Sequence, residues 1–148
     1  MDFQFRFAKL LQLRRRQRDD VGAEVGKAHS AIHRVDERIE SIQLERQRLR
    51  DESQQQRLGA VSIDGLLGQG RYDLQLQAQI QALNQTRGEL EQELQRRRAA
   101  LIAAEAEVKR FEKLQQKDFA VFQSMMNRRQ QAEIDDVVSC RYIINRQR

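Results

Sequence analysis

One stripe of residues repeats at alternating spacings of four and three from Phe7 to Leu49 without losing step. A mean spacing of about 3.5 residues keeps such a stripe facing one partner helix along its whole length, which is the pattern of a coiled coil. Ten of the thirteen positions are apolar, and the other three are arginine. The positions are Phe7, Leu11, Arg14, Arg18, Val21, Val25, Ala28, Ile32, Val35, Ile39, Ile42, Arg46 and Leu49.

A second stripe with the same spacing predicts a second long helix. It consists of Leu76, Ile80, Leu83, Arg87, Leu90, Leu94, Arg97, Leu101, Ala104, Val108 and Phe111. Beyond Phe111 the apolar residues adopt an eleven-residue spacing, as from Val108 to Phe119, which locally relaxes a left-handed supercoil. Because the chain contains no proline among its 148 residues, nothing in either stripe forces a helix to break.

A glycine-rich segment separates the stripes and predicts a chain reversal. Four of the seven glycines lie between Gly59 and Gly70, and Ser62 or Asp64 is suited to cap a short helical turn there. We therefore expect an all-α fold, a long antiparallel two-helix coiled-coil hairpin. The expected single domain covers residues 1–148, with helix one at about 5–57, the reversal at about 58–71 and helix two at about 72–140.

A reversal near residue 65 also predicts the register and the ends of the hairpin. Facing residues would have numbers that add up to about 130, so Phe7 would face the region of Phe122, and Leu49 the region of Ile80. Both termini would lie at one end of a rod. That end is basic and rich in phenylalanine, since residues 1–18 carry six lysines and arginines against Asp2 alone, and it is the expected contact surface.

The arginine cluster from Arg14 to Arg18 admits three interpretations: a solvated face, a phosphate-binding patch, or a docking site for an acidic protein. Arg14 and Arg18 lie on the stripe itself, which favours a partner, because polar residues on a seam cost stability. Phe3, Phe5 and Phe7 beside this cluster are able in principle to bind a membrane surface. Insertion into a protein groove is the favoured interpretation.

No catalytic or metal-binding pattern emerges from the sequence. His29 and His33 are one helical turn apart, but they lack the zinc-protease motif and are interpreted as surface histidines. The segment from Gly65 to Gly70 lacks the lysine and hydroxyl of a phosphate-binding loop. We therefore expect no enzymatic activity, no cofactor and no metal.

The location of the protein follows from what the sequence lacks. The solitary Cys140 rules out an internal disulfide and fits a reducing compartment. No apolar run approaches the 18 residues of a membrane span, and the N-terminus lacks the apolar core of a signal peptide. The expectation is a cytoplasmic protein without direct membrane insertion.

Short motifs at both ends resemble those of a known family. Phe3-x-Phe5-x-Phe7 leads into Leu10-Leu11-x-Leu13-Arg14, and the chain continues through the coiled coil to Glu133-Ile134-Asp135-Asp136. This order resembles the bacterial flagellar export protein FliJ and its relatives in type III secretion. The resemblance implies a non-enzymatic component of the flagellar export apparatus, similar to the rotor shaft of the F-type ATPase. Its implied partners are the hexameric flagellar export ATPase, the export gate membrane protein and export chaperones.

The resemblance also implies two sets of contact residues. Implied ring-binding residues are Phe5, Phe7, Leu10, Leu11, Arg14, Arg15, Arg18, Asp135 and Asp136. Val137 and Val138 depart from the smaller residues that follow the family's acidic motif. Candidate gate contacts, chosen because they lie in the half toward the reversal, are Ile42, Leu49, Tyr72 and Leu76. The implied location is peripheral, at the cytoplasmic face of the inner membrane.

Three alternatives stay open at this point. A stalk protein of an injection-type secretion system would share the same shape. A basic nucleic-acid-binding coiled coil would bind DNA with an affinity that falls steeply with salt, although no nucleic acid is the expected partner. A structural spacer would dimerise through an exposed seam without an ATPase partner.

Overall fold

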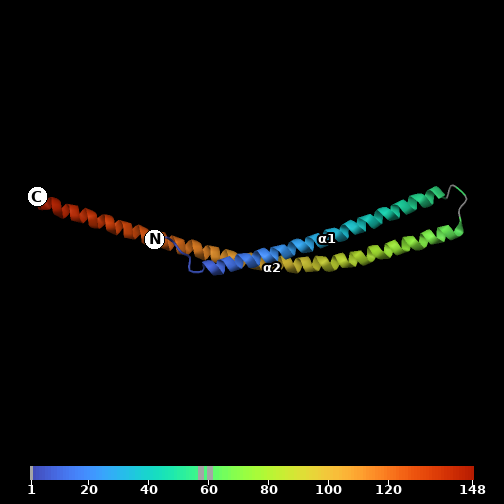
Figure 1. Cartoon of the computed structure of the whole chain (residues 1–148), viewed down its shortest axis with the longest axis horizontal. Coiled ribbons are helices and arrows are strands. Elements are labelled where there is room, and N and C mark those ends of the chain that lie inside the picture. The colour runs from blue at the N-terminus through green and yellow to red at the C-terminus, as the bar shows by residue number, and fades with distance from the viewer. Residues whose placement is uncertain (1, 57–58, 60–61) are drawn as a thin grey trace. The chain divides into compact units, whose positions relative to one another are not determined.

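Two helices account for most of the chain. The computed structural model describes residues 2–56, 59 and 62–148, and within them helix α1 spans Ala8–Gln56 and helix α2 spans Ile63–Arg146. Good helix formers fill both segments, and the absence of proline lets each one continue unbroken. The two helices pack against each other in opposite directions, so the predicted all-α helical hairpin is confirmed (Figure 1).

The predicted stripes are the packed faces of the helices. Each of the thirteen positions from Phe7 to Leu49, and each of the eleven from Leu76 to Phe111, is buried or half-buried. Ile42 is the most deeply buried, with 1% of its surface exposed. The two stripes therefore form most of the core, as in other coiled coils, and Phe5 is the buried residue outside them. The fully buried members of the stripes are Leu11, Ala28, Ile42, Leu76, Leu94 and Val108.

Helix α2 begins about nine residues before the predicted start at residue 72, which is therefore wrong. Ser62 does cap it, because the Gly65 N–H donates to Ser62 Oγ at 3.4 Å. Asp64 lies in the first turn, where a negative charge is favourable. Ser62 therefore caps the long helix itself and not a short separate turn. Gly65, Gly68 and Gly70 lie within this helix.

The other predicted boundaries need smaller changes. Helix α1 starts at Ala8 and ends at Gln56, close to the expected 5 and 57. Helix α2 ends at Arg146 instead of near Cys140, because no proline or glycine stops it there. The expected reversal shrinks to the few residues between the helices, of which 57, 58, 60 and 61 lie outside the described residues.

The register also differs from the prediction. Phe7 packs on Phe111 and not on Phe122, with ring centroids 6.3 Å apart. Phe122 packs instead on Phe3 at 5.5 Å. Leu49 lies beside Gln69 and Asp73 in a shallow groove rather than opposite Ile80. Facing residues have numbers that add up to about 122 rather than about 130, because α2 already begins at Ile63.

The chain divides into two compact units. Unit 1 combines residues 2–18 with residues 103–148, and unit 2 contains residues 19–102. In unit 1, Phe5, Leu11 and Val108 form a buried cluster, with Phe3, Phe7, Phe111 and Leu114 packed around it. The phenylalanine residues before Ala8 thus fold back onto α2 and close the core at that point.

In unit 2, the seam arginines are satisfied by carboxylates of the opposite helix. Arg46 Nε donates to Asp73 Oδ1 at 2.9 Å, and Arg87 Nε donates to Asp36 Oδ1 at 2.5 Å. Charge-assisted hydrogen bonds of this kind offset the cost of placing a cation on the seam.

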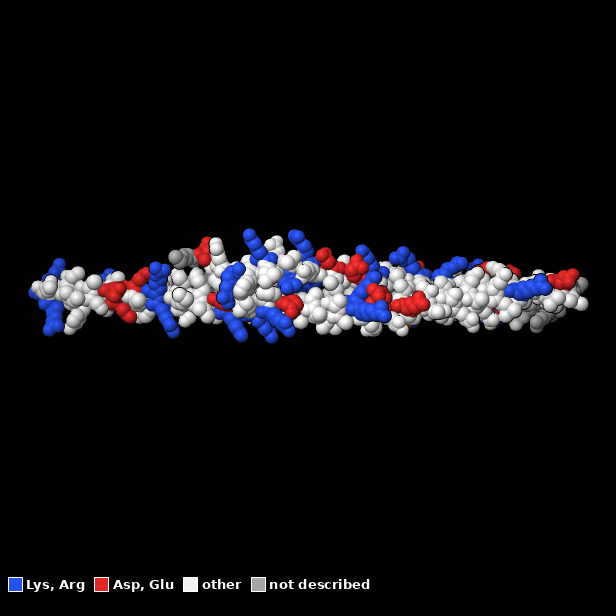
Figure 2. Space-filling model, turned by 90° about the horizontal axis from the view of Figure 1, so that it is seen from below, with Lys and Arg blue, Asp and Glu red and all other residues white. Residues whose placement is uncertain are grey.

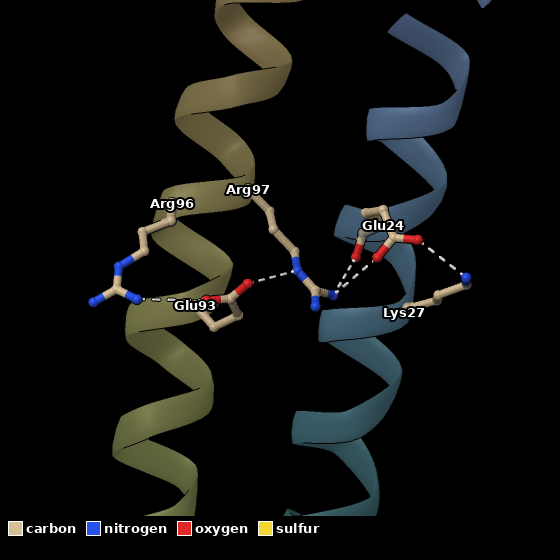
Figure 3. A network of polar contacts seen from close by, with 5 residues as sticks. All are labelled: Glu24, Lys27, Glu93, Arg96 and Arg97. Carbon is tan, nitrogen blue, oxygen red and sulfur yellow. Dashed lines mark hydrogen bonds and ion pairs between the residues drawn. The ribbon is translucent and has the colours of Figure 1, made fainter. Parts of the chain in front are cut away.

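The third seam arginine of unit 2 lies in a larger network (Figure 3). Arg97 Nη1 donates to the Glu24 carbonyl at 2.9 Å and lies 3.7 Å from the Glu24 carboxylate. Its Nε donates to Glu93 at 3.0 Å, while Lys27 donates to Glu24 at 3.0 Å. The hydrogen bond from Lys27 is the main reason that the pKa of Glu24 lies below its usual value. This network joins α1 to α2 across the seam.

Replacing Gly26 with alanine is expected to stabilise the hairpin by about 0.5–1 kcal/mol. A Cβ added at Gly26 would meet no atom within 4 Å, and the residue lies inside α1. Thermal denaturation followed by circular dichroism measures the change. Gly22→Ala is the matched comparison, since its Cβ would lie 3.9 Å from Leu101 Cδ1, an ordinary contact. A fall in stability for Gly26→Ala would mean that this helix needs local flexibility there.

Candidate functional site

The predicted ring-binding residues of the N-terminal segment lie together in unit 1. We call Phe5, Phe7, Leu10, Leu11, Arg14, Arg15 and Arg18 the N-terminal patch. Phe5 and Leu11 are buried, and Phe7 and Leu10 are half-buried. The Phe7 ring stacks edge-on against Phe5 at 5.9 Å and against Phe111 at 6.3 Å. The apolar half of the patch is therefore fixed in place by α2.

The arginines of the patch are held in different ways. Arg15 Nη2 forms an ion pair with Glu112 of α2 at 3.2 Å and stays exposed. Arg14 and Arg18 are half-buried on the stripe. Arg14 Nη1 donates to Gln17 at 3.0 Å, but its Nε is buried without a hydrogen-bond partner among the described residues. An unsatisfied buried donor costs about 1–3 kcal/mol, so the position of Arg14 on the stripe is energetically unfavourable.

Asp135 and Asp136 are not brought to the N-terminal patch by the packing of unit 1. Both are exposed on the last part of α2, where residues 127–148 are all exposed. Asp135 accepts a hydrogen bond at 3.1 Å from Gln131 of the same helix. It follows Phe122, the last ring packed on Phe3, by about 13 residues, or roughly 20 Å of helix. The acidic pair and the patch therefore form two separate surfaces.

The four candidate gate residues lie in unit 2, and they divide into core and surface. Ile42 and Leu76 are buried in the seam. Leu49 is half-buried in the groove that it shares with Leu66 and Gln69. Tyr72 is exposed, and its hydroxyl donates to the Glu45 carboxylate. Direct contact with a partner thus suits Tyr72 and Leu49, while Ile42 and Leu76 hold the two helices together.

Tyr72 and the neighbouring ion pair of Arg46 with Asp73 form a small polar cluster whose pKa values are shifted. Hydrogen bonds from Arg46 to both Asp73 oxygens, at 2.9 and 3.4 Å, hold the pKa of Asp73 below its usual value. The same bond raises the pKa of Arg46. The hydrogen bond to Glu45 raises the pKa of Tyr72, because the negative carboxylate disfavours a phenolate. At neutral pH the cluster therefore contains a neutral phenol and an ion pair between α1 and α2.

Acidification is expected to weaken this ion pair, and Asp73→Asn tests the effect. Because folding lowers the pKa of Asp73, its stabilisation is complete above the ordinary value of 3.8. That stabilisation is lost as the pH falls through the lowered pKa. The difference in unfolding free energy between the native protein and Asp73→Asn should shrink below about pH 3.8. Urea denaturation across this range measures it, with the exposed Asp51→Asn as control. A difference that stays constant would contradict the ion-pair contribution.

Positive charge is concentrated in unit 1. By sequence, unit 1 has fifteen lysines and arginines against eight acidic residues, a net charge of +7. Unit 2 has twelve against fourteen, a net charge of −2, and together they give +5. Figure 2 shows several basic side chains projecting where the start of α1 lies beside α2. Unit 1 is therefore the surface to which an acidic partner would be drawn.

Sequence reasoning missed part of this surface. Arg6 Nε forms an ion pair with Asp118 Oδ2 at 3.3 Å, and its guanidinium lies 4.8 Å from the centroid of the Phe7 ring. Phe3 packs between Phe119 and Phe122 and lines a shallow groove with Arg6 and Asp118. The stripe spacing gave no signal for these contacts, because residues 2–7 are not helical.

The histidines are both on the surface. His33 Nε2 lies 2.9 Å from Glu37 Oε1, and His29 Nε2 lies 3.0 Å from Arg98 Nη2. Within residues 2–56, 59 and 62–148, no three histidine, cysteine or acidic side chains gather as a metal site would require. In the same part of the chain, neither helix has an apolar stretch long enough to cross a membrane.

Comparison with known protein families places the chain in one of them. The family model described as Flagellar FliJ protein matches residues 3–147, which is nearly the whole chain. No curated protein and no solved structure matches the sequence. The matched range includes the N-terminal patch, both helices and the acidic pair Asp135 and Asp136.

Proposed function

Because the chain belongs to the flagellar FliJ family, whose members are components of the flagellar export apparatus, we propose that it acts as the central stalk of the export ATPase. In this proposal it binds the hexameric ATPase and stimulates ATP hydrolysis without catalysing a reaction itself. It also contacts the export gate membrane protein and export chaperones, at the cytoplasmic face of the inner membrane. The observation that carries the proposal is the family match over residues 3–147, which contains the pre-formed N-terminal patch.

The packing of unit 1 suggests how the N-terminal patch would act. Phe5 and Leu11 are buried against Val108, so they position the segment rather than contact the ring. Arg15 is exposed, and Arg14 has an unsatisfied buried Nε. These arginines, with Arg18, would bind acidic groups of the ATPase, in keeping with the net charge of +7. Pre-organisation of the patch would lower the entropy cost of binding.

The acidic pair and unit 2 would supply the remaining contacts. Asp135 and Asp136 are exposed and separate from the patch, so they would meet a different part of the ATPase. Tyr72 and Leu49 are the accessible members of the proposed gate contact. Ile42 and Leu76 would support the gate contact indirectly, because their buried side chains keep α1 and α2 packed beneath Tyr72.

Titration of the export ATPase of the same organism with this protein tests the proposal. We expect ATP hydrolysis and hexamer formation to rise, and the protein alone to hydrolyse no ATP. A variant with Arg14, Arg15 and Arg18 changed to glutamine should keep its helical content and stimulate at least about tenfold less well, since each charged contact is worth about 1.5–3 kcal/mol. Changing Arg34, Arg38 and Arg48 to glutamine is the matched control, because these are exposed arginines of α1 in unit 2.

The outcomes separate binding from folding. Equal loss in both triple variants would mean a general charge effect and would remove the patch as the docking site. Loss of helical content in the first variant would make its arginines structural. No stimulation and no binding by the unchanged protein would overturn the stalk proposal itself.

A further inference from the structure

The two helices of unit 2 are weakly joined where they approach the chain reversal. We call residues 49–56 of α1 and 63–70 of α2 the turn-side end of unit 2. None of its side chains is buried, and the half-buried ones are Leu49, Ser53 and Gln69, of which two are polar. Little apolar burial therefore holds this end closed. Farther from the reversal the packed seam is rich in apolar residues, which include Ile32, Val35, Ile39 and Ile42 of α1 and Leu76, Ile80 and Leu83 of α2.

The polar contacts of the turn-side end are also incomplete. Gln69 Nε2 donates to Gln56 Oε1 of the other helix at 2.9 Å. Gln69 Oε1, however, is buried and has no hydrogen-bond partner among the described residues. This oxygen would regain hydration if the helices separated, so closing them carries a cost at this residue. A groove of about 380 Å³ beside it, lined by Leu49 and Leu66 among others, shows that the apolar side chains do not fill the seam here.

The start of α2 is weak as a helix in its own right. Gly65, Gly68 and Gly70 all lie within its first eight residues. Each glycine inside a helix lowers the helix equilibrium about two- to fivefold relative to alanine, because its backbone loses more entropy on folding. Packing does not require these glycines, since a Cβ at Gly68 or Gly70 would meet no atom within 4 Å. The cap by Ser62 offsets about one or two of the three glycines.

Strong contacts begin at the far side of the turn-side end. Arg46 donates to both oxygens of Asp73, at 2.9 and 3.4 Å, and the Tyr72 hydroxyl donates to the Glu45 carboxylate. Both contacts join α1 to α2 at adjacent positions. The next seam residues, Ile42 and Leu76, are buried. The seam thus changes from weak to strong at the ion pair of Arg46 with Asp73.

We propose that the turn-side end opens locally while the rest of unit 2 stays folded, and that the ion pair of Arg46 with Asp73 marks where the opening stops. In the open form, residues 63–70 unwind and separate from residues 49–56. Proteins open in such segments when few buried contacts hold them. Opening separates Leu49 from Leu66, and it leaves Tyr72 at the boundary. The opening is a property of this chain alone and does not depend on the proposed contact with the export gate.

Hydrogen exchange of the full chain, followed by NMR at single amides, tests the opening. If residues 63–70 unwind, the amides of residues 67–72 lose their helical acceptors. After correction for intrinsic rates, these amides should exchange at least about 100-fold faster than those of residues 76–90. Equal protection in the two segments overturns the proposal.

Glycine replacements distinguish local opening from unfolding of the whole hairpin. Gly68→Ala combined with Gly70→Ala should slow exchange at residues 67–72 by about 5- to 30-fold. Gly88→Ala is the matched control, because its Cβ also meets no atom within 4 Å but lies in the middle of α2. Gly88 is helical in the closed and the open form, so its replacement should leave exchange at residues 67–72 unchanged. A comparable slowing by Gly88→Ala would mean that these amides exchange only when the whole hairpin unfolds, which overturns the proposal.

A change on the seam tests the second cause of the opening. Gln69→Leu removes the unsatisfied Oε1 and places an apolar side chain beside Leu49, so exchange at residues 67–72 should slow at least about tenfold. Gln55→Leu is the control, because Gln55 is exposed in the same end and does not line the groove. It should change exchange less than about twofold. Equal effects of the two variants would contradict a polar seam as the cause and overturn the proposal.

Removal of the ion pair tests the boundary. Asp73→Asn should let the opening extend toward Leu76, so the amides of residues 75–80 should exchange at least about threefold faster. Exchange at residues 84–90 should not change. Unchanged exchange at residues 75–80 would show that the ion pair does not limit the opening, and it would overturn the boundary that the proposal assigns.

Discussion

Replacing Ile42 with aspartate is expected to unfold the pairing of α1 and α2 in unit 2. Ile42 is 1% exposed at the centre of the seam, so the change removes a buried side chain and places a carboxylate where it finds no partner. The expected loss in the free energy of unfolding is at least about 4 kcal/mol, which is large against the stability of an ordinary domain. Urea denaturation followed by circular dichroism measures it.

Leu44→Asp is the matched control, two residues further along the same helix. Leu44 is 56% exposed, so the same substitution should cost less than about 1 kcal/mol. Similar losses at the two positions would contradict the assignment of Ile42 to the seam. The pair also shows that any loss of gate binding by Ile42→Asp arises from unfolding, because its side chain is not accessible to a partner.

Replacing Leu11 with alanine is expected to release the N-terminal segment from unit 1. Leu11 is 2% exposed and packs in the cluster with Phe5 and Val108. A leucine-to-alanine change in a buried cluster costs about 2–5 kcal/mol, through lost burial and the cavity that remains. We expect faster hydrogen exchange in residues 3–18 and earlier proteolysis there. Stimulation of the ATPase should fall as well, because the patch loses its fixed shape.

Leu13→Ala provides the comparison with identical chemistry. Leu13 is 47% exposed on the other side of the same turn, so its removal should change stability by less than about 0.5 kcal/mol. If Leu13→Ala lowers ATPase stimulation while hydrogen exchange is unchanged, Leu13 itself contacts the ring. If Leu11→Ala leaves exchange and stimulation unchanged, the apolar cluster does not position the patch.

The candidate site could be predicted only in part. The sequence located a basic, phenylalanine-rich N-terminal segment, and the structure places Phe5, Phe7 and Leu11 together in unit 1. Which of these rings are buried could not be predicted, because residues 2–7 follow no helical period and their packing depends on α2. The ion pairs of Arg6 with Asp118 and of Arg15 with Glu112 depend equally on which residues α2 presents.

The sequence by itself determined which face of each helix is packed. Coiled-coil packing depends on a local period, so a spacing of four and three residues was enough to identify every stripe position that the structure buries. Only the tertiary structure decided the register, which differs from the predicted one by about one heptad. Such a shift places apolar stripe against apolar stripe again, so the period cannot exclude it. The bonds of Arg46 to Asp73 and of Arg87 to Asp36 distinguish the two registers, because they join residues far apart in sequence.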